Sequence, residues 1–344
     1  MKRKLLFALV SLLVLQTAYF SQAIAAAKRV RVGYLPVTGH AKFFVAQEKG
    51  FFREEGIDVE LIEFQNSADG ISAVRAGKLD VGAFGTTAPL VHISRGADLQ
   101  VIGGVMGEDA AIVVTAANAG RVKRVTDLKG KKVATVRLAS GDAVLRGALS
   151  RAGIDWQRDL EIFELKNPPA VIEAVKSGQV DAGVVWGPHD LRAEEQGLKV
   201  VLRSGELSPG HPCCRLAANR KTVTDQPRVW VGFLRAILKA EKFAKENRPE
   251  TVAIIVKYLK LDPTLVEQAY YSPHLDQSSD PNVKGVEHFW STMQKSGFIE
   301  SQEQIKPHIN TDLYRQALDS LVREQPKEPY WQQLQKTFSQ RNRS

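Results

Sequence analysis

Residues 71–82 read Ile71-Ser-Ala-Val-Arg-Ala-Gly-Lys-Leu-Asp-Val-Gly82, and residues 172–183 read Ile172-Glu-Ala-Val-Lys-Ser-Gly-Gln-Val-Asp-Ala-Gly183. The two stretches align without a gap at a constant offset of 101 positions. Each copy has the pattern of an amphipathic helix that ends at a glycine and is followed by a short buried strand. The offset exceeds the roughly 20 to 50 residues of solenoid and propeller repeats. The pattern therefore predicts a duplicated domain.

The repeat extends towards the N-terminus of each copy. Both copies open with a short apolar strand, followed by a polar turn that contains glycine, a helix and a second strand. These elements are expected at 31–34, 40–55 and 58–64 in the first copy, and at 132–136, 141–151 and 160–164 in the second. Strands that alternate with helices in this way form parallel sheets covered on both faces. We therefore expect two α/β lobes in tandem.

The segments outside the repeat indicate how the lobes are connected. Strand-like runs at 99–105 and 112–115, joined by Gly107-Glu-Asp109, are expected to lead from the first lobe into the second. A short strand at 214–218 would lead back. Helical patterns that would pack on the first lobe follow at 230–247, 249–259, 263–271, 283–295 and 311–323.

The predicted fold class is α/β, with two lobes, two parallel-rich sheets, a hinge and a helical C-terminal extension. The expected parts are a signal peptide (1–27), the first part of lobe I (28–108), lobe II (109–208), the return to lobe I with the C-terminal helices (209–326) and a polar tail (327–344). We expect the tail to be weakly ordered, or ordered only by docking.

The N-terminus has the order of a secretory signal: Lys2-Arg-Lys4, an apolar run to about Phe20, and an alanine-rich exit. The apolar run is shorter than the roughly 20 residues of a spanning helix. Cleavage before Lys28 would lower the formal charge from +9 to +6. From this signal we expect a soluble, periplasmic monomer. Secretion argues against nucleic acid as its partner, so the excess of basic residues indicates a solvated surface with a mild preference for anions.

Ligands of open parallel α/β sheets bind at the carboxyl ends of strands, where helix N-termini offer free N–H groups. This rule selects the loops after four strands. In lobe I the candidate residues are Tyr34, Pro36, Gly39, His40, Gly85, Thr86 and Thr87; in lobe II they are Arg137, Ser140, Gly141, Asp142 and Trp186. Their site would take a small molecule.

Each of these side chains also has a purely structural interpretation. The hydroxyls of Thr86, Thr87 and Ser140 could cap a helix or bind a ligand oxygen. Arg137 could bind a carboxylate, sulfonate or phosphate, or form an exposed salt bridge. Trp186 could stack on a flat ligand or anchor the core, and Tyr34 has the same two interpretations.

Several motifs together resemble the substrate-binding proteins of ABC importers, in the family of the aliphatic-sulfonate, taurine, nitrate and thiamine-pyrimidine-precursor binders. The matching motifs are Arg31-Val-Gly-Tyr34, Gly50-Phe-Phe52, Glu55-Gly56, Gly77-Lys-Leu-Asp-Val-Gly82, Asp127-Leu-Lys-Gly-Lys-Lys-Val133, Gly178-Gln-Val-Asp-Ala-Gly183 and Trp186-Gly-Pro188. The resemblance implies a periplasmic binding fold that closes on one ligand by a hinge motion. It implies a membrane permease as partner and no cofactor.

Within this family the site residues that carry over best are Thr86, Thr87, Ser140 and Gly141. The stretch His211-Pro-Cys213-Cys214-Arg215 departs from the sulfonate binders and resembles the pyrimidine-precursor branch. We therefore add His211, Cys213 and Cys214 to the candidate ligand contacts. The two cysteines could equally be small buried apolar residues.

Two other classes of function compete with a binding protein. An enzyme related to the thiamine-pyrimidine synthases would share the fold, but the secretory signal and the absence of a recognisable cofactor loop or catalytic constellation in the sequence argue against it. A metal-binding protein could use the histidines and cysteines, but their spacing matches no metal motif. The sequence therefore favours a binding protein without enzymatic activity, resident metal or cofactor.

Overall fold

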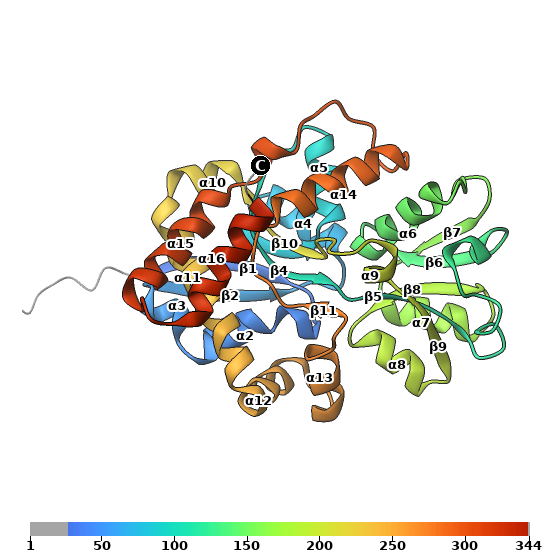
Figure 1. The fold of residues 1–344 in the computed structure, drawn as a ribbon, viewed down its shortest axis with the longest axis horizontal. Coiled ribbons are helices and arrows are strands. Elements are labelled where there is room, and N and C mark those ends of the chain that lie inside the picture. Colours follow the sequence, from blue (N-terminus) through green and yellow to red (C-terminus); the bar gives the residue numbers. More distant parts are fainter. Residues whose placement is uncertain (1–26, 343–344) are drawn as a thin grey trace, which may run out of the picture.

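The structure is a computed structural model that describes residues 27–342 and shows two lobes side by side (Figure 1). The predicted signal peptide, apart from Ala27, lies outside the described residues. Within the described range, no helix combines the length and the apolar character needed to cross a membrane.

The repeated stretch forms the same unit in each lobe. Helix α4 (Ser67–Arg75) leads into strand β3 (Val81–Gly85), and α7 (Pro168–Lys176) leads into β8 (Ala182–Trp186). Gly77 (φ +69°) and Gly178 (φ +75°) end the two helices in the left-handed conformation. This conformation costs glycine little because it has no Cβ atom.

The aspartates of the repeat hold neighbouring strands together. The backbone N–H of Arg31 donates to Asp80 Oδ2 at 2.8 Å, and that of Lys132 donates to Asp181 Oδ2 at 2.9 Å. In return, the N–H of each aspartate donates to the carbonyl of the same partner. The partners Arg31 and Lys132 are also 101 positions apart. Both residues of this contact are thus displaced by the same 101 positions as the rest of the repeat, which shows that both lobes share the contact.

The glycine at the end of each repeat lets the sheet and its covering side chains approach closely. A Cβ atom at Gly82 would lie 2.1 Å from the ring of Phe84, and one at Gly183 would lie 2.5 Å from Val171 Cγ1. Any larger residue would need these neighbours to move.

Each lobe has one mixed sheet (Figure 1). Lobe I has the strand order β11-β4-β10-β3-β1-β2, and lobe II has the order β7-β6-β8-β5-β9. The strands of the repeat run parallel, whereas β10 and β5 pair antiparallel with their neighbours. The remaining strands are β1 (Lys28–Tyr34), β2 (Ile57–Glu63), β4 (Leu99–Glu108), β5 (Ala110–Thr115), β6 (Lys132–Val136), β7 (Glu161–Leu165), β9 (Leu198–Arg203), β10 (Cys214–Asn219) and β11 (Leu275–Asp276).

Short helices cover both sheets. They are η1 (Thr38–His40), α2 (Ala41–Glu48), α3 (Phe51–Glu54) and α5 (Thr87–Ser94) in lobe I, and η2 (Val125–Leu128), α6 (Ser140–Arg151), α8 (His189–Glu195) and α9 (Ser204–Leu207) in lobe II. The helix expected over 40–55 is observed as α2 and α3, preceded by the turn η1. The break between α2 and α3 falls at Gly50, which adopts a left-handed conformation (φ +75°).

The chain passes between the lobes twice. It leaves lobe I between β4 and β5 at Glu108 and Asp109, both of which have positive φ angles. It returns between α9 and β10. The two crossings are joined, because the N–H of Glu108 donates to the carbonyl of His211 at 3.1 Å and the N–H of Gly210 donates to Glu108 Oε1 at 2.7 Å.

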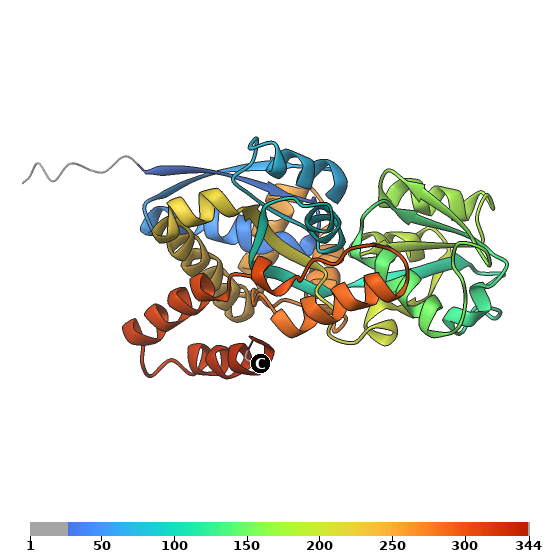
Figure 2. The same ribbon diagram turned by 90° about the horizontal axis from the view of Figure 1, so that it is seen from above.

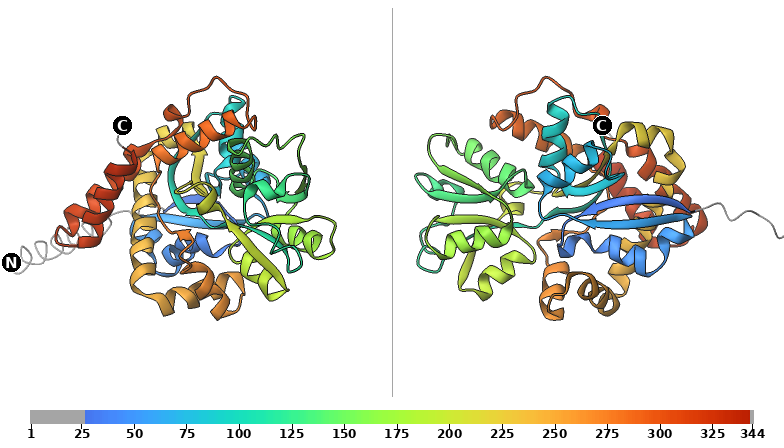
Figure 3. Two further views of the ribbon diagram at one scale, coloured as in Figure 1. Left: turned by 45° about the vertical axis from the view of Figure 1, so that its right-hand side comes forward. Right: turned by 180° about the vertical axis from the view of Figure 1, so that it is seen from behind.

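The C-terminal extension packs mainly on lobe I, as the views in Figures 2 and 3 show. Helix α14 also reaches lobe II, where it packs against α6. At its end, Trp156 Nε1 of lobe II donates to the carbonyl of Ser296 at 2.7 Å. The elements are α10 (Arg220–Asp225), α11 (Pro227–Glu246), α12 (Arg248–Leu259), α13 (Pro263–Tyr270), α14 (Val283–Lys295), η3 (Lys306–His308), α15 (Thr311–Glu324) and α16 (Pro329–Asn342).

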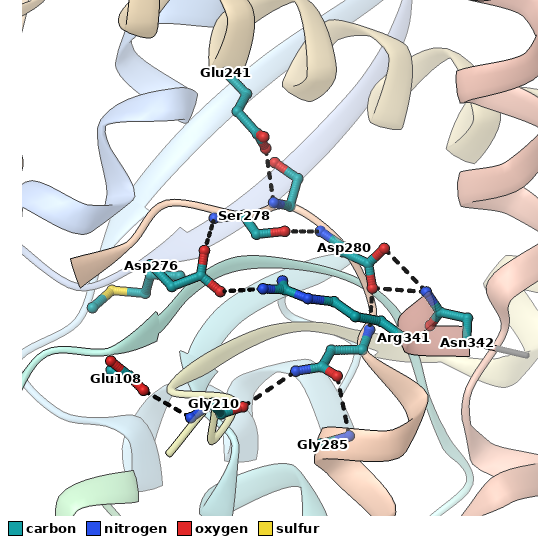
Figure 4. A network of polar contacts seen from close by, with 12 residues as sticks. Glu108, Gly210, Glu241, Asp276, Ser278, Asp280, Gly285, Arg341 and Asn342 are labelled. Carbon is teal, nitrogen blue, oxygen red and sulfur yellow. Dashed lines mark hydrogen bonds and ion pairs between the residues drawn. The ribbon is translucent and has the colours of Figure 1, made fainter. Parts of the chain in front are cut away.

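The predicted polar tail forms helix α16, which docks on the preceding helices. Its residues Trp331, Leu334 and Phe338 are buried, and their spacing places them on one face of the helix. At its end, Asn342 Nδ2 donates to both carboxylate oxygens of Asp280, at 2.8 and 3.0 Å (Figure 4). The helix is therefore fixed by apolar contacts along its length and by polar contacts at its last turn.

Candidate functional site

Residues of both lobes line two cavities between them. The inner cavity has a volume of about 20 Å³, room for about one water molecule. The outer cavity has a volume of about 220 Å³. Leu35, Val37 and Trp186 line both cavities, so they form the boundary between the two spaces. The other residues of the inner cavity are Ser67, Gly85, Met106, Ala110, Ala139, Ser140, Gly141, Cys213 and Cys214.

The lobes contact each other directly at the inner cavity. Ser140, the first residue of α6 in lobe II, donates its hydroxyl to the carbonyl of Cys213 at 2.6 Å. Thr86 of lobe I donates to the same carbonyl twice, through its N–H at 2.8 Å and its hydroxyl at 3.2 Å. One buried carbonyl thus accepts hydrogen bonds from both lobes. The structure therefore has the lobes closed on each other.

The two cysteines lie beside this contact. Both are buried and free, with their Sγ atoms 3.9 Å apart. Hydrogen bonding between the two thiols and burial raise the pKa of Cys213 well above its ordinary value. Cys213 therefore contributes a neutral, weakly polar thiol to the lining of the inner cavity.

The structure brings part of the predicted site together. Gly85, Ser140, Gly141, Trp186, Cys213 and Cys214 line the inner cavity, and Pro36 lines the outer one. Thr86 reaches the same place through the Cys213 carbonyl. Thr87 is buried next to it as the first residue of α5, and its hydroxyl has no hydrogen-bond partner among the described residues.

Several predicted contacts from lobe I support the cavity wall without lining it. His40 is buried, and its Nδ1 accepts a hydrogen bond from the N–H of Leu35 at 3.1 Å. Burial lowers the pKa of His40 to about 3, so the ring is neutral and can accept that bond. Gly39 lies against Met106, whose Sδ would be 2.4 Å from a Cβ at this position.

Tyr34 and His211 also lie outside both linings. The Tyr34 hydroxyl contacts Glu63 at 3.4 Å, and its ring packs edge-on against Phe44. His211 is buried with its ring stacked on Phe289 at a centroid distance of 6.2 Å. Burial lowers the pKa of His211 to about 4. Each of these rings therefore packs against another part of the protein and not against the cavities.

The charged candidates of lobe II also lie elsewhere. Arg137 is exposed and lines neither cavity, and the chain turns directly after it at Leu138 (φ +58°). Asp142 is buried in α6 and pairs with Arg146, with Oδ1 2.8 Å from Nε. Burial raises the pKa of Asp142 to about 6. The i, i+4 spacing of this pair was a signal for it in the sequence.

The sequence analysis missed Ser67 and Met106 of the inner cavity and Gln65, Asn167 and Arg192 of the outer one. One signal for them was present, since Asn66 and Asn167 are also 101 positions apart. Each caps its helix, Asn66 by accepting from the N–H of Asp69 and Asn167 by accepting from the N–H of Ala170. The first residue of each capped helix lines a cavity: Ser67 lines the inner one and Pro168 lines the outer one.

Two α/β lobes, two crossings and a cleft lined from both sides define the two-lobed fold of the periplasmic binding proteins. The chain belongs to the NMT1-like family, whose model matches residues 24–260. A relative from Brucella abortus (strain 2308), assigned as a binding protein, is 31% identical over 252 residues, which cover 72% of this chain and 76% of the relative.

Solved structures share the fold. The periplasmic nitrate-binding protein NrtA from Synechocystis PCC 6803 matches with a TM-score of 0.75 and 17% identity, covering 86% of this chain and 89% of that one. The periplasmic aliphatic sulphonate binding protein SsuA from Escherichia coli matches with a TM-score of 0.70 and 23% identity, covering 83% and 92%. A further relative, the 4-amino-5-hydroxymethyl-2-methylpyrimidine phosphate synthase of Uromyces fabae, is 27% identical over 58% of this chain and 61% of its own length.

Proposed function

We propose that this protein is the solute-binding component of an ABC importer and that it captures a small organic or anionic ligand between its lobes. The main support for this proposal is that both lobes line each of the two cavities. At the inner cavity, the hydroxyl of Ser140 of lobe II donates to the Cys213 carbonyl of lobe I. A ligand that contacts both lobes stabilises the closed arrangement relative to an open one. The names of the related proteins support a sulfonate, a nitrate-like anion or a pyrimidine precursor as ligand.

The remaining parts of the proposal follow from this role. The partner would be a membrane permease, and the protein would act as a secreted monomer in the periplasm. It would release its ligand unchanged. The relative named as a synthase supplies the alternative, an enzyme that converts the ligand bound in the same cleft.

Native mass spectrometry of the purified protein tests the proposal. We expect the folded protein to carry one small molecule that is lost on unfolding. Incubation of that molecule with the protein, followed by mass analysis of the solution, then separates binding from catalysis. Turnover of the molecule would replace the binding function with the enzymatic one.

The double substitution Thr86→Ala with Ser140→Ala is expected to weaken ligand binding while the unliganded protein stays folded. Both hydroxyls bond to the Cys213 carbonyl in the closed structure. Because one such hydrogen bond contributes about 1 kcal/mol, the two losses should raise the dissociation constant by roughly tenfold or more. Titration calorimetry with the ligand identified by mass spectrometry measures the effect.

The control is Ser94→Ala. Ser94 ends α5, and its hydroxyl bonds locally to the carbonyl of Val91 at 2.9 Å. This variant should bind like the wild type. Equal affinity of all three proteins would show that the two hydroxyls are not part of the ligand site.

A further inference from the structure

The outer cavity is larger than the inner one, and its polar lining differs. Its volume of about 220 Å³ exceeds the 20 Å³ of the inner cavity. The inner cavity is lined by neutral side chains. Besides Leu35, Val37 and Trp186, which both cavities share, the outer cavity is lined from the two lobes. Lobe I supplies Pro36, Gln65, Leu259 and Leu261, and lobe II supplies Asn167, Pro168, Pro169, Pro188, His189 and Arg192.

Arg192 gives the outer cavity its charge. It is the one lysine or arginine among the residues that line either cavity, and neither lining contains an aspartate or glutamate. Its guanidinium forms no ion pair and no side-chain hydrogen bond within residues 27–342. Three acidic side chains share helix α8 with Arg192. Asp190 is already paired with Arg203 of β9, and neither Glu194 nor Glu195 forms an ion pair with Arg192 in the described part of the chain. The positive charge at this cavity is therefore not neutralised by the protein.

His189 lies one turn before Arg192 on α8 and lines the same cavity. Its Nδ1 is buried and has no hydrogen-bond partner in the described part of the chain. Burial, followed by the charge of Arg192, lowers the pKa of His189 to about 4. The imidazole is thus neutral beside the guanidinium, with one ring nitrogen left to bond a further group.

The other walls of the cavity are mostly apolar. Four prolines, Leu35, Val37, Leu259, Leu261 and Trp186 supply them. An inorganic anion would leave these walls without a partner, whereas an alkyl or aryl group would cover them. A carboxylate or sulfonate can accept two parallel N–H bonds from one guanidinium.

We infer that the outer cavity binds an organic monoanion, with Arg192 pairing to its carboxylate or sulfonate group and the apolar walls around Trp186 holding its hydrocarbon part. Arg192 is therefore a specificity-determining residue, which selects anions over neutral molecules of the same shape. This inference rests on the proposed binding function and names its ligand class. It also moves the anion site from Arg137, the arginine that the sequence suggested, to Arg192.

The test compares matched probes on matched variants by titration calorimetry. Benzoate and benzenesulfonate are the anions, and benzamide is the neutral analogue. We expect the wild type to bind at least one of the anions about tenfold or more tightly than benzamide, and Arg192→Gln to weaken anion binding by about tenfold to a hundredfold. Binding of benzamide should change by less than about twofold, and Arg192→Lys should restore part of the loss because it keeps the charge without the bidentate geometry.

Two further variants separate a local site from a general effect of charge. Arg137→Gln and Arg121→Gln remove exposed arginines of lobe II that line neither cavity. Both should stay within about twofold of the wild type, since exposed charges act weakly through water. Thermal unfolding of each variant verifies that it is folded.

Several results would overturn the inference. They are failure of the wild type to bind either anion, equal binding of benzamide and the anions, unchanged anion binding by Arg192→Gln, and an equal loss in Arg137→Gln. If the protein nevertheless retains a co-purified small molecule in native mass spectrometry, the proposed binding function stands and only the anion site fails. Absence of any retained or bound small molecule contradicts the binding function itself.

Discussion

Glu241→Ala is expected to lower the free energy of unfolding by about 3 to 5 kcal/mol, because it leaves a buried lysine without its nearest carboxylate. Lys42 and Glu241 are 1% and 2% exposed, and Nζ lies 3.9 Å from Oε2. The carboxylate of Glu241, which is labelled in Figure 4, accepts from the N–H of Ser279 at 2.7 Å and from the Tyr330 hydroxyl at 2.9 Å. The substitution removes all three interactions.

Urea unfolding at pH 7 measures this effect. The control is Glu246→Ala on the same helix, where the carboxylate is exposed and pairs with Lys242 at 2.6 Å. Exposed pairs contribute little, so this control should change stability by about 0.5 kcal/mol or less. Similar losses in the two variants would contradict the assigned importance of the buried pair.

The pH dependence supplies a second readout. Burial lowers the pKa of Lys42 from 10.5 to about 8. Between these two values the unfolded chain binds more protons than the folded one, so the contribution of Lys42 to the free energy of unfolding rises with pH. Because Glu241 favours charged Lys42, its removal should lower that pKa further. The deficit of Glu241→Ala should therefore become smaller as the pH rises from 7 to 9.

Phe84→Ala is expected to cost about 3 to 5 kcal/mol of stability, because three of the residues that surround the ring are glycines, which have no side chain to fill the cavity that is left. The buried ring lies over Gly33, Gly70 and Gly82, and a Cβ at each of them would come within 2.7, 2.1 and 2.1 Å of ring atoms. Phe64 packs edge-on against the same ring, with centroids 5.7 Å apart.

Thermal and urea unfolding measure the loss. The control is Phe163→Ala in lobe II, where the side chain is 40% exposed and little buried surface is lost. It should cost about 1 kcal/mol or less. If Phe84→Ala costs no more than the control, the glycine-rich surroundings of Phe84 relax far more than the structure implies.

Most of the secondary structure could be predicted from the sequence, because the signals are local. Hydrophobic periodicity, the glycines at Gly77 and Gly178 and the 101-residue offset act within one helix–strand unit. The strands expected at 58–64 and 160–164 differ from the observed ones by one residue at each end. The helix over 40–55 was predicted as continuous because Gly50 alone does not reveal its left-handed conformation.

The candidate site was predicted only in part. Ser140, Gly141 and Trp186 were found because the carboxyl ends of parallel strands lie at one edge of a sheet. Arg137 and Asp142 follow the same strand but lie outside both cavities, whereas Arg192 had no motif to mark it. The rule selects a region of the fold, and it does not select the direction of an individual side chain.

The sequence by itself determined that the chain is a duplicated α/β unit with a helical extension, since the repeat and the periodicity depend on neighbouring residues alone. The tertiary structure decided which side chains meet. Ser140 bonds to the carbonyl of Cys213, 73 positions away, and α14 crosses to lobe II. Such contacts depend on strand register, on helix rotation and on segments that pack from distant parts of the chain, and a shift of one residue in register turns a side chain from the cleft to the solvent.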